Sequence, residues 1–210
     1  DALLQDYEPG TTAAELEAMF GALRPGLVAL RDKVLGAPAP AELAGTFDES
    51  AQMKLSRQIA KVFGYDMSRG RVDKAVHPFS SGSGNDVRIT TRTSPTDPFN
   101  CIYSTIHEVG HAAYEQNIDQ AYLLTPLGSG VSMGVHESQS RIYENQLGRS
   151  RSFTGWLYGQ MTDASEISGS TGQMRSMQRS TGSTTGTSAL NPTRFNITCI
   201  FCCGLIWNVN

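Results

Sequence analysis

The feature that most constrains the fold is the segment 97–117, because it carries a strong helix start and two histidines at helical spacing. Asp97 is a good N-cap, and Pro98 suits the first helical position. We therefore expect one helix over the whole segment. Residues four apart lie on one face of a helix, one turn from each other. This helix would present His107 and His111 side by side.

The sequence HEVGH at 107–111 has the H-E-x-x-H pattern, in which the histidines and the glutamate have different tasks. His107 and His111 can offer two nitrogens to one ion, and zinc binds imidazole nitrogen at about 2.0–2.1 Å. Glu108 is rotated by about 100° from His107 around the helix axis, so it can reach a water molecule beside the ion. The alternative interpretation is a chance pair of helical histidines.

A catalytic zinc needs a third protein ligand and one open position. We favour Glu137, in the segment GVHESQSRIYEN, on a second helix expected from Val131 or Gly134 to Leu147. The predicted ligands are then His107, His111 and Glu137, with Glu108 as the catalytic base.

Three other side chains near the motif are alternative candidates for the third ligand: Glu115, Glu144 and His136. Glu115 lies a full turn beyond His111, so its carboxylate should miss the ion. Glu144 lies two turns beyond Glu137, which favours a place at the surface or behind the ligands. His136 points elsewhere on its helix, and we expect either a supporting contact behind the ligands or a partly buried histidine.

Most of the remaining pattern is helical. A capping box at Thr12 and Glu15 starts one helix, which the Pro-Gly pair at 25–26 should interrupt. Asp48 is expected to cap another helix, ended by Gly64.

Between 72 and 93 the pattern changes: AVHPF and DVRITTRT are short, alternating and separated by SSGSGN, which indicates a hairpin or two edge strands. The predicted fold is mainly α with a small antiparallel β element.

Composition excludes several classes of protein. The net charge is −3 and there is no block of basic residues, which argues against a nucleic-acid partner. The longest apolar run, 197–207, is too short and too interrupted to span a membrane. Cys101 stands alone while the other cysteines crowd the end, so we expect no disulfide framework and a cytoplasmic setting. The pair Cys199-x-x-Cys202 lacks the second pair that a zinc knuckle needs.

Several motifs together resemble one family. HEVGHAAYEQ followed by GVHESQSRIYEN is similar to the carboxypeptidase Taq family of thermostable metallocarboxypeptidases. HPF at 77–79 and Asp86-x-Arg88-x-Thr90 resemble two further motifs of that family, in the same order, and DALLQDYEPG resembles its interior. The resemblance implies a helical, zincin-like metallopeptidase with a small sheet near the active site, often a homodimer. It implies zinc, or cobalt or another divalent metal in its place, and release of single residues from peptide C-termini.

The resemblance also divides the chain. Residues 1–163 are expected to form an internal part of such a catalytic domain. The match fades near Asp163, and 164–210 is rich in Gly, Ser and Thr and poor in charge. We interpret 164–210 as an unrelated or out-of-frame end.

An enzyme that removes C-terminal residues must recognise a free carboxylate, for which arginine is the natural partner. Arg88 is the first candidate, with Arg92 and Arg141 behind it, and an ion pair with Asp86 is the structural alternative. His77 is expected to bind substrate or to cap the hairpin.

Arg141, one turn after Glu137, is expected to steady that carboxylate.

Three alternative functions stay open. The first is a zinc endopeptidase or oligopeptidase with the same ligands, and the second is an inactive fragment of such an enzyme. The third is a helical module in which four protein ligands close a structural zinc site.

Overall fold

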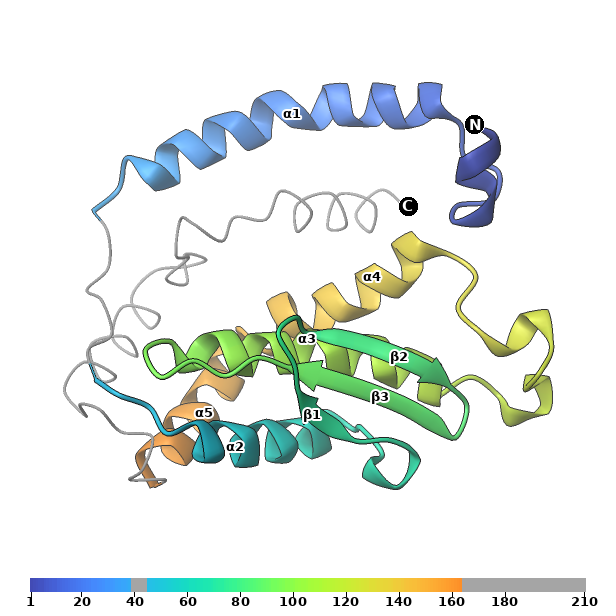
Figure 1. Ribbon diagram of the computed structural model, residues 1–210. Coiled ribbons are helices and arrows are strands. Elements are labelled where there is room, and N and C mark those ends of the chain that lie inside the picture. Colours follow the sequence, from blue (N-terminus) through green and yellow to red (C-terminus); the bar gives the residue numbers. More distant parts are fainter. Residues whose placement is uncertain (39–44, 164–210) are drawn as a thin grey trace. The chain divides into compact units, whose positions relative to one another are not determined.

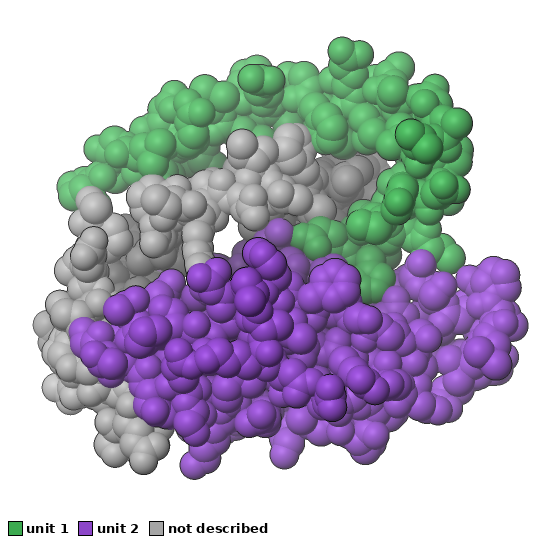
Figure 2. Space-filling view, viewed as in Figure 1, with its two compact units in different colours: residues 1–40, 131–138, 190–210 green, residues 41–130, 139–189 purple. Residues whose placement is uncertain are grey.

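The computed structural model describes residues 1–38 and 45–163 (Figure 1). The predicted end segment 164–210 lies outside these described residues. The described chain divides into two compact units, coloured in Figure 2. Unit 1 holds 1–38 and 131–138, and unit 2 holds 45–130 and 139–163. None of the helices in the described ranges has the length and apolar character needed to cross a membrane.

Unit 1 begins with the short 3-10 helix η1 (Ala2–Asp6) and the long helix α1 (Ala13–Leu35). The predicted capping box at Thr12 and Glu15 is confirmed. The predicted interruption at Pro25 is wrong, because α1 continues through it. An interior proline costs about 3 kcal/mol, but good helix formers such as Ala, Leu and Arg lie on both sides and keep the flanking turns helical.

The start of α4 (Met133–Arg141) also belongs to unit 1, and Glu8 holds it there. The Glu8 carboxylate accepts hydrogen bonds from the Ser132 hydroxyl, at 3.0 Å, and from the backbone N–H of Gly134. The Met133 N–H donates to the Tyr7 carbonyl at 3.1 Å. Glu8 and the Tyr7 carbonyl thus each satisfy one N–H group in the first turn of α4 that would otherwise lack a partner.

Two well-capped helices form the frame of unit 2. Asp48 accepts from the Ala51 N–H at 2.7 Å at the start of α2 (Glu49–Val62), and Gly64, with φ of +89°, follows its end. Asp97 accepts from the Asn100 N–H at 3.2 Å at the start of α3 (Pro98–Gln116). Both helices begin and end where the sequence predicts.

The sheet of unit 2 has three strands, β1 (Val72–Lys74), β2 (Phe79–Ser83) and β3 (Asp86–Thr91), in the order β1-β3-β2. A hairpin forms as expected, since β2 and β3 pair antiparallel. Its first strand is shifted, however: of AVHPF only Phe79 lies in β2, and the rest of β2 comes from the expected loop at 80–85. The sheet is mixed rather than wholly antiparallel, because β1 pairs parallel with β3. The three residues of β1 are too few to show an alternating pattern, so no pattern along the chain predicts this pairing.

Helix α3 is the centre of unit 2, because it contributes to both hydrophobic clusters. Ile102 and Ile106 pack with residues of α2 and of α5 (Arg151–Asp163), while Val109 and Ala112 pack with the sheet. Figure 1 shows β2 and β3 running alongside α3. The histidine-bearing helix is therefore fixed on two sides.

The helix predicted to end at Leu147 does so, but its last part has a different form. After Arg141 the chain continues as the π-helical segment η5 (Ile142–Leu147), in which the Gly148 N–H donates to the Tyr143 carbonyl at 2.7 Å. Helix α5 follows and was not predicted. The other short 3-10 helices are η2 (Met67–Arg69), η3 (Gln120–Tyr122) and η4 (Pro126–Gly128).

Candidate metal centre

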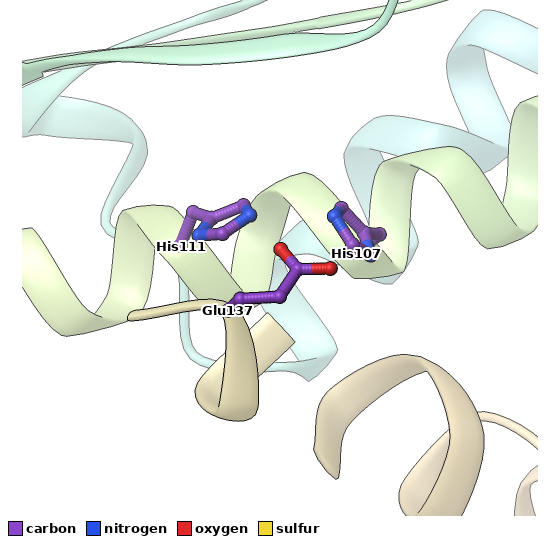
Figure 3. A group of neighbouring side chains, drawn as sticks. All are labelled: His107, His111 and Glu137. Carbon is purple, nitrogen blue, oxygen red and sulfur yellow. The ribbon is translucent and has the colours of Figure 1, made fainter. Parts of the chain in front are cut away.

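The structure brings together the three side chains predicted as ligands. Each of His107, His111 and Glu137 offers one ligand atom, and these atoms lie within 4.8 Å of one another (Figure 3). All three side chains are half-buried. Within 1–38 and 45–163, one group of three or more His, Cys, Asp or Glu side chains is close enough together to hold a metal ion, and it is this one. Glu137 points toward the two imidazoles in Figure 3.

The donor set suits a divalent metal that accepts nitrogen and oxygen. Two imidazole nitrogens and one carboxylate oxygen are a known zinc ligand set, and three protein ligands leave one coordination position open. The two rings lie edge to face, with centroids 4.9 Å apart. The residues therefore fit the metal that their chemistry implies.

Glu108 lies on the same helix but in a different environment. Its side chain is buried, with 7% of its surface exposed, while the neighbouring His107 is half-buried. The position agrees with the expected rotation of about 100° between adjacent helical residues. Glu108 is not one of the three grouped side chains, and its expected role as catalytic base stays a prediction.

Gly110 explains how α4 comes close enough to α3. A Cβ atom at this position would lie 2.5 Å from the Ser140 Cα and 3.0 Å from the Gln139 carbonyl oxygen. The two helices therefore touch backbone to backbone at this point, which only glycine allows. Glu137 lies one turn before Ser140 on α4, so the close approach also brings its carboxylate toward the histidines.

Gly110→Ala is expected to destabilise the chain by about 2 kcal/mol. The added methyl group gains about 1 kcal/mol of helix propensity, but overpacking costs about 1–3 kcal/mol or more, and here the obstacle is backbone that cannot rotate away. The free energy of unfolding from urea titration tests this. Gly155→Ala in α5 is the matched control, because nothing lies within 4 Å of its Cβ position. Equal stability changes in the two variants would contradict the proposed close contact.

Glu144 lies behind His107 and carries several contacts at once. Its Oε2 lies 3.1 Å from His107 Nδ1 and accepts from Arg141 Nη1 at 3.0 Å, and its Oε1 accepts from Arg149 Nη2 at 3.1 Å. Burial acts to raise the pKa of Glu144, but the hydrogen bond with His107 and the charges of His107, Arg141 and Arg149 outweigh it and hold that pKa below its ordinary value. The carboxylate is thus anionic at neutral pH.

This network corrects part of the sequence-based interpretation. Of the two places expected for Glu144, the surface and a position behind the predicted ligands, the structure shows a largely buried carboxylate beside His107. The structure pairs Arg141 with Glu144, while its expected role beside Glu137 stays a prediction. Arg149 was not singled out, although its guanidinium also lies 4.1 Å from the ring centre of Tyr103. Arg149 belongs to no sequence motif, and it reaches Glu144 from the turn between η5 and α5.

The predicted substrate-binding residues lie on the hairpin of unit 2. Arg88 Nε and Nη2 each donate to Asp86 at 2.7 Å, and both side chains are exposed. The structural alternative for Arg88 is therefore present, and a role toward substrate stays a prediction. His77 is exposed before β2, and its backbone carbonyl accepts from the Thr90 hydroxyl at 3.0 Å. His136 is half-buried on α4.

The chain thus combines a mainly helical fold with a group of two histidines and one glutamate that suits a divalent metal. The chain belongs to the carboxypeptidase Taq (M32) metallopeptidase family, whose model matches residues 1–184. The predicted family and the mainly α fold class are thereby confirmed.

Known relatives give the extent of the similarity. The chain is 46% identical over 158 residues to thermostable carboxypeptidase 1 of Thermus thermophilus, which covers 73% of this chain and 31% of that protein. It is 41% identical over 171 residues to carboxypeptidase 1 of Bacillus subtilis, covering 80% and 34%. The crystal structure of the M32 carboxypeptidase from Deinococcus radiodurans superposes with a TM-score of 0.76 at 43% identity, covering 83% and 36%. The chain thus spans about a third of the length of these relatives.

Proposed function

We propose that this chain is part of a zinc carboxypeptidase that releases amino acids from the C-termini of peptides. The observation that carries the proposal is the grouping of His107, His111 and Glu137 within 4.8 Å in a chain of this family. The relatives named above are carboxypeptidases, which supports the same reaction type here. Zinc fits the donor set best, and cobalt or another divalent metal is expected to substitute.

In this proposal three side chains bind the metal and a fourth, Glu108, transfers the proton. A divalent metal at the site would supply Lewis acidity, which lowers the pKa of water and polarises a peptide carbonyl. Glu108 takes the proton of the attacking water on its carboxylate and later delivers it to the nitrogen of the leaving amine. Its burial keeps bulk water from competing for that proton. His107, His111 and Glu137 hold the site and leave Glu108 unligated.

Arg88 is proposed to bind the terminal carboxylate of the substrate. At present its partner is Asp86, in a pair whose side chains are 53% and 61% exposed. Exposed ion pairs contribute only about 0–1 kcal/mol, so exchanging Asp86 for a substrate carboxylate costs little. The proposal gives His77, on the same hairpin, a second contact with substrate, and His136 and Arg141 supporting contacts behind the ligands.

A peptide with a blocked C-terminus tests the exopeptidase reaction. The chain with zinc is expected to release the last residue from a free peptide, and C-terminal amidation should reduce kcat/KM by at least about 100-fold, because the bidentate carboxylate contact is lost. Equal cleavage of both peptides would show a zinc endopeptidase with the same ligands. Cleavage of neither peptide by the zinc-loaded chain would identify an inactive fragment.

The remaining parts of the proposal concern the setting of the enzyme. Peptides are the proposed partners, and the net charge of −3 supports the absence of nucleic acid among them. A homodimer and a cytoplasmic location are proposed on the family resemblance and on the cysteine pattern respectively. Sedimentation velocity of the purified chain measures the first of these directly.

A further inference from the structure

Glu144 contacts one histidine and two guanidinium groups, and the reaction proposed above gives it no task. It receives a guanidinium from each side: Arg141 precedes it on α4, and Arg149 follows it after η5. Their side chains are only 11% and 22% exposed, and that of Glu144 is 14% exposed. Removing three charged groups from water costs free energy, which is recovered only when they form well-placed hydrogen bonds and ion pairs with one another.

The main chain is shaped to bring Glu144 to His107. Glu144 lies in the π-helical segment η5, a rare form that recurs at functional sites. Gly148 ends this segment, and a Cβ there would lie 3.1 Å from the Ile106 Cδ1 atom and 2.9 Å from the Glu144 carbonyl oxygen. Because Ile106 directly precedes His107, the glycine lets η5 pack on α3 next to the histidine.

The contacts of Glu144 decide which nitrogen of His107 carries the proton. A carboxylate that accepts hydrogen bonds from two guanidinium groups is an anion and can only accept. The His107 atom that faces it, at 3.1 Å, is Nδ1, so Nδ1 must be the donor. In a neutral imidazole with the proton on Nδ1, the free electron pair is on Nε2.

We infer that Glu144 is a positioning residue that fixes His107 as the Nδ1–H tautomer and so prepares Nε2 as a metal ligand. This inference rests on the proposed metal centre and adds to it a residue outside the H-E-x-x-H segment. Arg141 and Arg149 orient the carboxylate, since each binds a different oxygen of Glu144. Arg149 is itself held over the ring of Tyr103, one turn before His107 on α3.

The tautomer can be measured without any metal. Nitrogen-15 NMR of the metal-free chain, at a pH above the titration of its imidazoles, distinguishes Nδ1–H from Nε2–H. The chain has only 4 histidines, so the spectrum of His107→Ala assigns the signals. The expected result is an Nδ1–H tautomer for His107 in the wild-type chain. An Nε2–H tautomer would overturn the inference.

Zinc affinity gives a second, independent readout. Glu144→Gln is expected to weaken zinc binding by about 10- to 100-fold, as loss of the partner behind a ligating histidine does. Glu49→Gln is the control, because it removes one carboxylate from an exposed ion pair with Lys74 and should leave affinity unchanged. Unfolding curves of both variants give the folded fraction, by which the affinities are corrected.

The possible outcomes separate the two proposals. If Glu144→Gln binds zinc as tightly as the wild-type chain, the positioning role is overturned and the metal centre stands. If the wild-type chain binds no zinc, the proposed function fails, while the tautomer of His107 still decides the role of Glu144. Recovery of affinity in Glu144→Asp, which keeps the charge, would support positioning by the anion.

Discussion

Replacing Glu108 with glutamine is expected to abolish peptide hydrolysis while the metal stays bound. Glutamine has nearly the same shape as glutamate but cannot take up the proton of the attacking water. Loss of a general base typically lowers kcat by about 10²–10⁴-fold. Glu108 is buried and is not one of the three grouped ligands, so the substitution should leave His107, His111 and Glu137 undisturbed.

The measurement pairs steady-state kinetics with elemental analysis of the same samples. We expect a large fall in kcat, an unchanged zinc content and little change in KM. Glu115→Gln is the matched control, because Glu115 is also a buried glutamate on α3, 9% exposed, and lies outside the ligand group. Its turnover should stay within about threefold of the wild-type value. Full activity in Glu108→Gln would remove this residue from the mechanism.

The ends of several helices could be predicted because they depend on short-range chemistry. Asp48 and Asp97 each accept a hydrogen bond from the N–H three residues ahead, and this needs no tertiary structure. The strand β3 was predictable for a similar reason, since its residues alternate between buried and exposed, whereas the Gly- and Ser-rich β2 has no such pattern and coincides with the expected loop. The interruption expected at Pro25 was wrong because local propensity in the flanking turns outweighed one lost hydrogen bond.

The candidate site was only partly visible in the sequence. The spacing of His107 and His111 places them on one helical face, and Glu137 was the acidic residue best placed on the next helix. The contacts of Glu144 were not predictable, because they depend on a π-helical segment and on the turn after it that contains Arg149. The role of Gly110 was also not predictable, since it depends on a close contact with the backbone of α4, which is distant in the sequence.

Removal of one histidine ligand is expected to empty the metal site. The purified chain should contain about one zinc ion, since the described residues hold one such ligand group. His111→Ala leaves two protein ligands, and a histidine and a carboxylate alone cannot hold zinc against dilution and buffer. The zinc affinity should fall by more than about 10- to 100-fold, which is the loss expected when only a hydrogen-bond partner of a ligand is removed.

Elemental mass spectrometry of protein purified without added metal measures the zinc content directly. His77→Ala is the control: it also removes one imidazole, but His77 is exposed before β2 and outside the ligand group. A ratio near one in the wild-type chain and in His77→Ala, falling toward zero in His111→Ala, would establish that α3 and α4 suffice to assemble the centre. An undiminished ratio in His111→Ala would place the zinc elsewhere and refute this ligand set. Because zinc content is measured without substrate, the result does not depend on whether a chain that spans about a third of its relatives is active.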